Sequence, residues 1–278
     1  MTKHPSIDKG KRGIYHLHNK LNDLTNKEWI KFTKSWFFCY PSKRKEKEKQ
    51  HPAKFPEKLA NEFIEFFTRK DEIVLDPFLG CGSTLIGCHQ AKRQGIGIEL
   101  QKRYYTLAKK NIQDTKNQTL ILGNSSKISS IWKEKKLPNV DFIITSPPYG
   151  SMLTKELGEI VKLRTKEGKD LKYSEDKEDL GNIKNYDKFL NELTKVFVKL
   201  KNILKKDKYL VIVVQNYIEG KEYKTLAWDI SAKLREHYTL KGERLWVQDH
   251  KSLMPYGYRY TFIPNIHHHY CLVFKNDK

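Results

Sequence analysis

The 278-residue sequence contains only four cysteines and no long apolar run. The cysteines form neither a CxxC pair nor a zinc-ligand spacing, so we expect no disulfide framework and no metal site. No stretch approaches the length that crosses a membrane, and the first residues lack the apolar core of a signal peptide. These absences predict a soluble cytoplasmic chain.

Three adjacent histidines, His267 to His269, are the only other suggestion of a metal. In an extended strand the middle ring points to the opposite face from its neighbours, so the three cannot easily share one ion. We therefore interpret them as the start of a strand.

Acidic residues are scarce relative to basic ones. Lysine and arginine total 53 against 33 aspartates and glutamates, which gives a formal charge of +20. Such a charge favours a polyanionic partner, and nucleic acid is the commonest. The alternative is a lysine-rich composition that merely keeps the protein soluble, so charge alone does not decide the partner.

From Lys54 onward, short β-branched runs alternate with amphipathic windows, a pattern typical of βαβ units around a parallel sheet. A basic extension, residues 1–53, precedes this domain at 54–278 and contains one expected helix that begins after Thr25. The expected strands are Glu72–Asp76, Gly95–Glu99, Thr119–Leu122, Asp141–Thr145 and Tyr209–Gln215. The expected helices are Pro56–Thr68, Ser83–Ala91, Lys102–Ile112, Tyr186–Leu204 and Leu226–Arg235. Two final runs, 240–249 and 267–275, predict an antiparallel hairpin.

A glycine-rich loop, DPFLGCGS from Asp76 to Ser83, connects the first of these strands to a helix. Glycines at this position let the backbone approach a ligand at the carboxyl edge of a sheet. Glu99 ends the next strand, where an acid can accept hydrogen bonds from ribose hydroxyls. The loop has neither the GxGxxG nor the GxxxxGK[ST] spacing, so a nucleoside without a pyrophosphate is the better fit.

The strand VDFIIT ends in Ser146, Pro147, Pro148 and Tyr149. Two prolines can simply terminate a strand, because neither donates to a ladder. Here, however, they lie at the carboxyl end of an expected parallel strand, close to the glycine loop. Open α/β sheets bind their ligands at that edge.

Together these motifs resemble those of amino-methylating DNA methyltransferases, the N4-cytosine and N6-adenine family. D-P-F-x-G-x-G is similar to the family's cofactor loop, and SPPY to its catalytic [S/T/D/N]-P-P-[Y/F/W]. The resemblance extends from Lys54 to the end of the chain. It implies a Rossmann-like class I methyltransferase fold, with a seven-stranded, mostly parallel sheet, a C-terminal antiparallel hairpin and helices on both faces. It also implies S-adenosyl-L-methionine as cofactor, double-stranded DNA as substrate and a cognate restriction endonuclease as partner.

The resemblance assigns roles to the loop residues. Asp76 would approach the methionine ammonium, Phe78 would pack beside the cofactor, and Glu99 would bind the ribose. Asn124, in LILGNSS, stands where the family has an acid that contacts the adenine, so one charge is lost there. The residues expected to bind the cofactor are Asp76, Phe78, Gly80, Gly82, Ser83, Glu99 and Asn124.

The catalytic roles follow from the chemistry of an aromatic amine, whose lone pair is delocalised into the ring. Acceptors around its protons favour a more nucleophilic nitrogen in the transition state. The Ser146 hydroxyl and the Pro147 carbonyl are the expected acceptors, and the prolines fix the direction of that carbonyl. Tyr149 would stack on a base flipped out of the duplex.

The target base and the DNA-reading segment are less constrained. Among relatives SPPY is commoner in N4-cytosine enzymes, which favours cytosine; N6-adenine, an RNA amino group and an inactive nucleic-acid-binding relative are the alternatives. Two segments are candidates for reading DNA: a charged insertion at 151–185, and a loop at 249–266 containing Tyr256, Tyr258, Arg259 and Tyr260.

Overall fold

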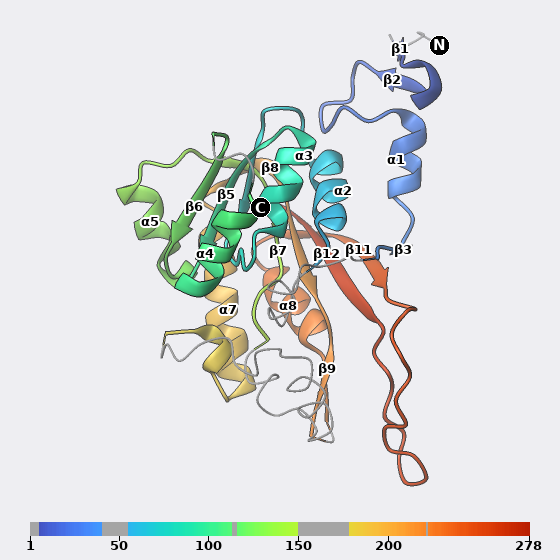
Figure 1. Cartoon of the computed structure of the whole chain (residues 1–278), viewed down its shortest axis with the longest axis vertical. Coiled ribbons are helices and arrows are strands. Elements are labelled where there is room, and N and C mark those ends of the chain that lie inside the picture. Colours follow the sequence, from blue (N-terminus) through green and yellow to red (C-terminus); the bar gives the residue numbers. More distant parts are fainter. Residues whose placement is uncertain (1–5, 41–54, 113–115, 150–177, 221) are drawn as a thin grey trace.

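The computed structural model describes residues 6–40, 55–112, 116–149, 178–220 and 222–278. Its centre is an eight-stranded sheet with the order β3-β11-β12-β8-β7-β4-β5-β6 (Figure 1). The five strands from β6 to β8 are parallel, and β12 runs antiparallel between β8 and β11. This confirms the expected α/β class and the antiparallel C-terminal hairpin.

The parallel half is built from successive strand–helix units. Its elements are α2 (Glu57–Phe67), β4 (Ile73–Asp76), α3 (Ser83–Ala91), β5 (Gln94–Glu99), α4 (Lys102–Asn111), β6 (Gln118–Leu122), the 3-10 turn Ser125–Lys127, α5 (Ile128–Glu134) and β7 (Val140–Thr145). Every residue of β7 is buried, as expected for a central strand covered on both faces. The expected elements occur within a few residues of their predicted bounds.

The second half begins within the last described residues of the expected insertion. It contains the 3-10 turn Leu180–Asn182, α7 (Tyr186–Leu200), β8 (Leu204–Val214), the short pair β9 (Tyr217–Glu219) and β10 (Glu222–Lys224), α8 (Leu226–Leu234), β11 (Thr239–Val247) and β12 (His268–Lys275). Residues 151–177 of the predicted insertion lie outside the described residues.

Two hydrophobic clusters cover the two faces of the sheet. Helices α2, α3 and α4 pack on one face, and α5, α7 and α8 on the other. Neighbouring residues of a strand point to opposite faces of the sheet and so pack in opposite clusters. Val74 packs in the cluster with α2, α3 and α4, and Leu75 packs in the cluster with α5, α7 and α8. No helix in the described ranges is long and apolar enough to span a membrane.

The N-terminal region contributes an eighth strand that the sequence did not predict. It contains β1 (Ser6–Asp8), the 3-10 turn Gly10–Arg12, β2 (Ile14–His16), α1 (Asn26–Phe32) and β3 (Trp36–Phe38). Thr25 caps α1 through a reciprocal capping box with Glu28, which confirms the expected helix start. β3 then pairs in parallel with the end of β11 and so widens the sheet by one strand.

Candidate active site

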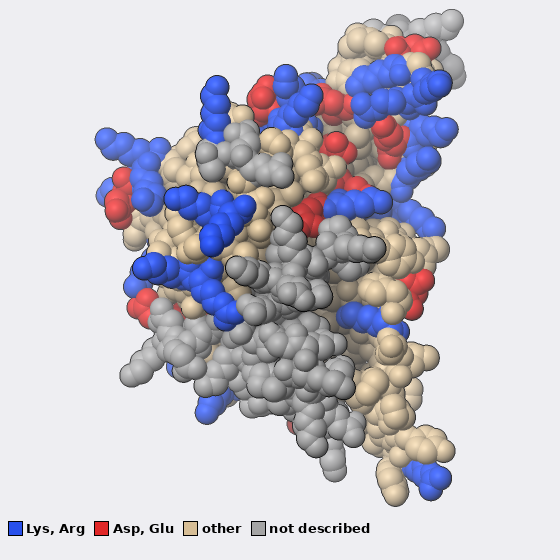
Figure 2. Space-filling model, in the orientation of Figure 1, with Lys and Arg blue, Asp and Glu red and all other residues tan. Residues whose placement is uncertain are grey.

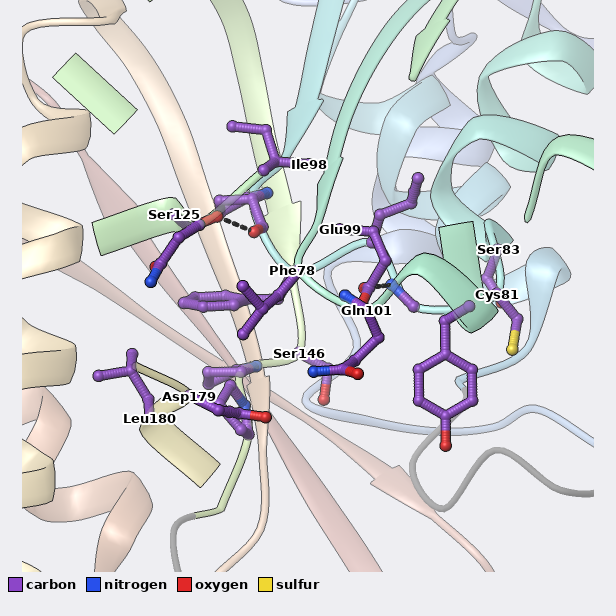
Figure 3. A pocket seen from close by; sticks show the side chains of 18 of the residues that line it. Phe78, Cys81, Ser83, Ile98, Glu99, Gln101, Ser125, Ser146, Asp179 and Leu180 are labelled. Atoms are coloured by element: carbon purple, nitrogen blue, oxygen red, sulfur yellow. Dashed lines mark hydrogen bonds between the residues drawn. The ribbon is translucent and has the colours of Figure 1, made fainter. Parts of the chain in front are cut away.

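A cavity opens at the carboxyl ends of β4, β5, β6 and β7, with an empty volume of about 830 Å³ including its mouth (Figure 3). The lining residues are Phe55, Pro77, Phe78, Leu79, Gly80, Cys81, Ser83, Ile98, Glu99, Leu100, Gln101, Tyr104, Asn124, Ser125, Ser146, Pro147, Pro148, Glu178, Asp179 and Leu180. The glycine loop and the end of β7 therefore face one space.

Most of the residues predicted for the site line this cavity. They are Phe78, Gly80, Ser83, Glu99, Asn124, Ser146, Pro147 and Pro148. Asp76, Gly82 and Tyr149 do not belong to the lining. The residues predicted to read DNA, Tyr256, Tyr258, Arg259 and Tyr260, lie in the loop between β11 and β12 and do not line the cavity either.

Glu99 is the principal acid on the cavity wall. Its two carboxylate oxygens accept hydrogen bonds from the backbone amides of Gly80, at 2.8 Å, and of Gln101, at 2.7 Å. Burial raises the pKa of Glu99 to about 7, although both amides oppose that shift. A carboxylate has about four acceptor positions, so each oxygen keeps capacity for a hydroxyl donor from a ligand.

The loop that carries Gly80 is tied to β5. Leu79 donates its amide to the carbonyl of Ile98 at 2.9 Å. Gly80 itself has φ +57°, in the left-handed region that favours glycine. At Gly80 the loop therefore presents bare backbone to Glu99.

Asp76 lies beneath the cavity, where its carboxylate forms hydrogen bonds with the glycine loop and with neighbouring elements. Its side chain is fully buried; Oδ1 accepts from the Phe78 amide at 3.0 Å and from the Thr145 hydroxyl at 2.6 Å. Oδ2 accepts from the Thr84 hydroxyl at 2.5 Å. Burial raises the pKa of Asp76 to about 6. In this arrangement Asp76 joins the glycine loop to β7, and its carboxylate is not presented to the cavity as the resemblance implied.

Asn124 begins the 3-10 turn after β6. Its side-chain oxygen accepts from the Ser126 amide at 2.9 Å, and its amide nitrogen lies 3.3 Å from a carboxylate oxygen of Glu178. Glu178 also pairs with Lys127 at 2.8 Å. These contacts join the β6 end of the cavity to Glu178, which lies within the expected insertion.

The first three residues of the tetrapeptide after β7 line the cavity, and the fourth is buried in the interior. Ser146 and Pro148 are half-buried and line the cavity together with buried Pro147. Tyr149 is only 3% exposed, and its ring packs edge-on against Tyr217 with centroids 6.4 Å apart. The ring would have to be uncovered before it could stack on a base.

Sequence reasoning missed several wall residues. Leu100 and Gln101 directly follow Glu99, so their position could have been inferred from it. Asp179 and Leu180 lie near the end of the charged insertion, 151–185, which was expected to read DNA and not to line this cavity. Asp179 is 6% exposed and accepts a hydrogen bond from the Gly181 amide at 2.8 Å.

The four cysteines are all buried, and Cys81 alone among them lines the cavity. Burial raises the pKa of Cys39 to about 11, and it also raises the pKa of Cys88 and of Cys271. Within the described residues, no group of three histidine, cysteine or acidic side chains is placed to hold a metal ion.

The cavity fits S-adenosylmethionine by the chemistry of its walls. Phe78, Leu79 and Leu100 offer apolar surface for an adenine and a thioether chain, while Glu99 offers acceptors for a ribose diol. The left-handed backbone at Gly80 leaves room for close approach.

Comparisons with known proteins agree with this chemistry. Residues 3–110 match the family model described as DNA methylase, and residues 71–158 match the model described as RNA cap guanine-N2 methyltransferase. Type II methyltransferase M.BglI of Bacillus subtilis is 36% identical over 92 residues, which are 33% of this chain and 26% of that protein. M.HpaI of Haemophilus parainfluenzae is 34% identical over 82 residues, 30% of this chain and 26% of that protein. The chain thus matches about a quarter of the length of these relatives.

The solved structure of TrmN from Thermus thermophilus has the same fold. It aligns with a TM-score of 0.51 at 12% identity, over 81% of this chain and 50% of that one.

Fold and cavity together have the architecture of the Rossmann-like class of methyltransferases, with walls suited to S-adenosylmethionine. Within this class the match of residues 3–110 to the DNA methylase model and the similarity to type II methyltransferases support an amino-methylating DNA methyltransferase, the type that includes the N4-cytosine and N6-adenine enzymes.

Proposed function

We propose that the protein methylates the exocyclic N4 of cytosine in double-stranded DNA, as the modification enzyme of a restriction–modification system with a cognate endonuclease. The observation that carries this proposal is the shared cavity: Ser146 and Pro147 lie on its wall together with Glu99. A donor bound at Glu99 would therefore have its reactive end near acceptors suited to an amine.

The residues of the chain act on the amine and its surroundings. S-adenosylmethionine, when bound, supplies an electrophilic methyl group on a sulfonium. The Ser146 hydroxyl and the Pro147 carbonyl accept hydrogen bonds from the amine, which favours a pyramidal nitrogen whose positive charge grows during transfer. Alignment of nitrogen and methyl then provides most of the remaining rate enhancement.

Cytosine is favoured over adenine because SPPY is commoner in relatives that make N4-methylcytosine. The hydroxyl of Ser146 would also lie at a different distance from the target amine than the carboxylate of DPPY or the amide of NPPY. Adenine N6 in DNA is the alternative that keeps the same site. An RNA amino group is a second alternative, supported by the match of residues 71–158 to an RNA methyltransferase model.

Substrate access in this proposal requires the target base to leave the duplex. Tyr149 would then stack on the extruded base after its ring is uncovered from Tyr217. The loop with Tyr256, Tyr258, Arg259 and Tyr260 would contact the DNA beside it.

The test is incubation of the protein with labelled S-adenosylmethionine and unmethylated DNA, and in a parallel reaction with RNA, followed by digestion to nucleosides. We expect label in N4-methyldeoxycytidine. Label in N6-methyldeoxyadenosine would contradict the cytosine assignment, and label in RNA alone would contradict DNA as substrate. Absence of label with intact binding of S-adenosylhomocysteine would identify an inactive relative.

A further inference from the structure

The loop between β11 and β12 forms a projecting arm, residues 249–266, which we call the aromatic arm (Figure 1). β11 runs antiparallel to β12, β12 antiparallel to β8, and β8 parallel to β7. β11 therefore has the same direction as β7. The arm leaves the sheet after Val247 at the edge where Ser146 follows β7, on the catalytic side of the molecule.

The arm exposes large apolar side chains that a soluble monomer normally covers. Leu253 is 76% exposed, Tyr258 70%, Tyr260 93% and Phe262 88%. In Figure 2 the arm protrudes at the lower right and is drawn mostly in the colour of uncharged residues. Exposed apolar groups that gather on one element usually mark an interaction surface.

Hydrogen bonds within the arm hold it in a defined shape. Asn265 accepts from the Met254 amide at 2.8 Å and donates to the Met254 carbonyl at 2.9 Å. At the tip, the Gly257 carbonyl accepts from the amides of Tyr260 and Thr261. Gly257 has φ +67°, and a Cβ there would lie 2.3 Å from the Thr261 carbonyl oxygen. Exposed rings on such an ordered arm lose little conformational entropy when they bind.

The charges of the arm favour DNA as the partner. The arm has one acidic residue, Asp249 at its base, which accepts a hydrogen bond from the Tyr40 hydroxyl at 3.0 Å, while Lys251 and Arg259 are basic. The chain as a whole carries +20, so a second copy would meet it with charge of the same sign. Basic groups suit phosphates, and aromatic faces suit bases.

We propose that the aromatic arm inserts into the DNA duplex as a wedge beside the target base, with Tyr260 and Phe262 entering the base stack. This inference rests on the proposed DNA methylation. Extruding a base costs unstacking energy. Apolar side chains inserted between base steps replace part of the lost stacking and hold the duplex open. Phe262 was not among the residues expected from the sequence.

The experiment compares wild type with a Tyr260→Ala/Phe262→Ala variant. Ile30→Ala is the matched control, since Ile30 is 70% exposed in α1, on a different part of the chain. Unmethylated plasmid incubated with enzyme and S-adenosylmethionine is first sequenced to locate the methylated site. A duplex with that site then carries 2-aminopurine next to the target base, and a second duplex has a mismatch opposite the target.

Wild type should raise 2-aminopurine fluorescence on binding, and the arm variant should not. The variant should bind and methylate the matched duplex roughly 5- to 150-fold less well, since stacking on one base is worth about 1–3 kcal/mol. On the mismatched duplex the defect should shrink, because a mismatched base costs less to extrude. Ile30→Ala should behave as wild type throughout.

Equal losses on both duplexes, or an unchanged fluorescence rise in the variant, would overturn the wedge. So would a dimer in sedimentation that the variant dissociates while methylation is retained, because the arm would then bind a second copy. Unchanged binding of S-adenosylhomocysteine shows that the variant is folded, and Asn265→Ala, which frees Met254, should reproduce its defect. Wild type that neither binds nor methylates duplex DNA would contradict the proposed function itself.

Discussion

The Thr145 hydroxyl donates a 2.6 Å hydrogen bond to Oδ1 of Asp76. Both side chains are completely buried, one at the end of β7 and the other at the end of β4. The bond therefore joins the strand that precedes the SPPY tetrapeptide to the strand that precedes the glycine loop. The relative position of the two motifs depends on a contact beneath the cavity.

Thr145→Val removes this donor and keeps the shape of the side chain. We expect a loss of about 1–3 kcal/mol in the free energy of unfolding, because a buried acceptor loses one of its partners. Urea unfolding measures the change. Thr106→Val, at an exposed threonine in α4, should remain within about 0.5 kcal/mol of wild type. Equal effects of the two substitutions would show that the bond adds nothing.

Glu99 should make cofactor binding depend on pH near neutrality. Burial raises its pKa to about 7, and a protonated carboxyl accepts more weakly from hydroxyls. The affinity for S-adenosylhomocysteine should therefore fall between about pH 8 and about pH 6, as measured by calorimetry. Glu99→Gln should bind weakly and with a smaller slope. A slope that persists unchanged in Glu99→Gln would have to come from another carboxyl, for which Asp76, with its pKa raised to about 6 by burial, is the candidate.

The same group has the opposite effect on stability. Its folded pKa of about 7 exceeds the value of 4.5 for an unperturbed glutamate, so the folded state binds the proton more tightly. The stabilisation it contributes is complete below about pH 4.5 and is lost as pH rises toward 7. Wild type should thus lose stability relative to Glu99→Gln across that window in denaturant titrations.

Ser146 and Cys81 face the same cavity and should differ sharply in their importance. Ser146→Ala should lower kcat roughly 100-fold, the usual cost of losing one preorganised hydrogen-bonding group. Its affinity for S-adenosylhomocysteine should be unchanged. Cys81→Ser should keep its activity within about twofold, because direct methyl transfer to an amine needs no thiolate. Inactive Cys81→Ser combined with active Ser146→Ala would refute the assignment of the acceptor.

The parts of the site that depend on local sequence could be predicted. Strand, glycine loop and helix follow one another closely, so the positions of Gly80 and Glu99 at the edge of the sheet followed from chain order. Ser146 was located in the same way, from the strand before it. Each of these inferences needs only the rule that ligands bind at the carboxyl ends of parallel strands.

The parts of the fold and site that depend on contacts between distant segments could not be predicted from the sequence. β3 pairs with residues 245–247, about two hundred positions away, and no local pattern specifies that partner. Asp76 was expected in the cavity, but three donors from separate elements hold it beneath the loop. Tyr149 is buried for a similar reason. The residue that covers its ring, Tyr217, is distant in the sequence and follows both α7 and β8.

Gly87 sets the distance between α2 and α3, the helix that begins at the cofactor loop. A Cβ there would lie 3.0 Å from the Ala60 Cβ and 3.0 Å from the Asn61 amide nitrogen. Gly87→Ala should improve helix propensity by about 1 kcal/mol but overpack the contact by about 1–3 kcal/mol, so net destabilisation is expected. Gln90→Ala, exposed on the same helix, is the control for propensity. Adding Ala60→Gly should relieve the overlap, so the double variant should be more stable than the sum of the single changes predicts. Strict additivity in urea unfolding would mean that the helices separate freely and that Gly87 does not set their spacing.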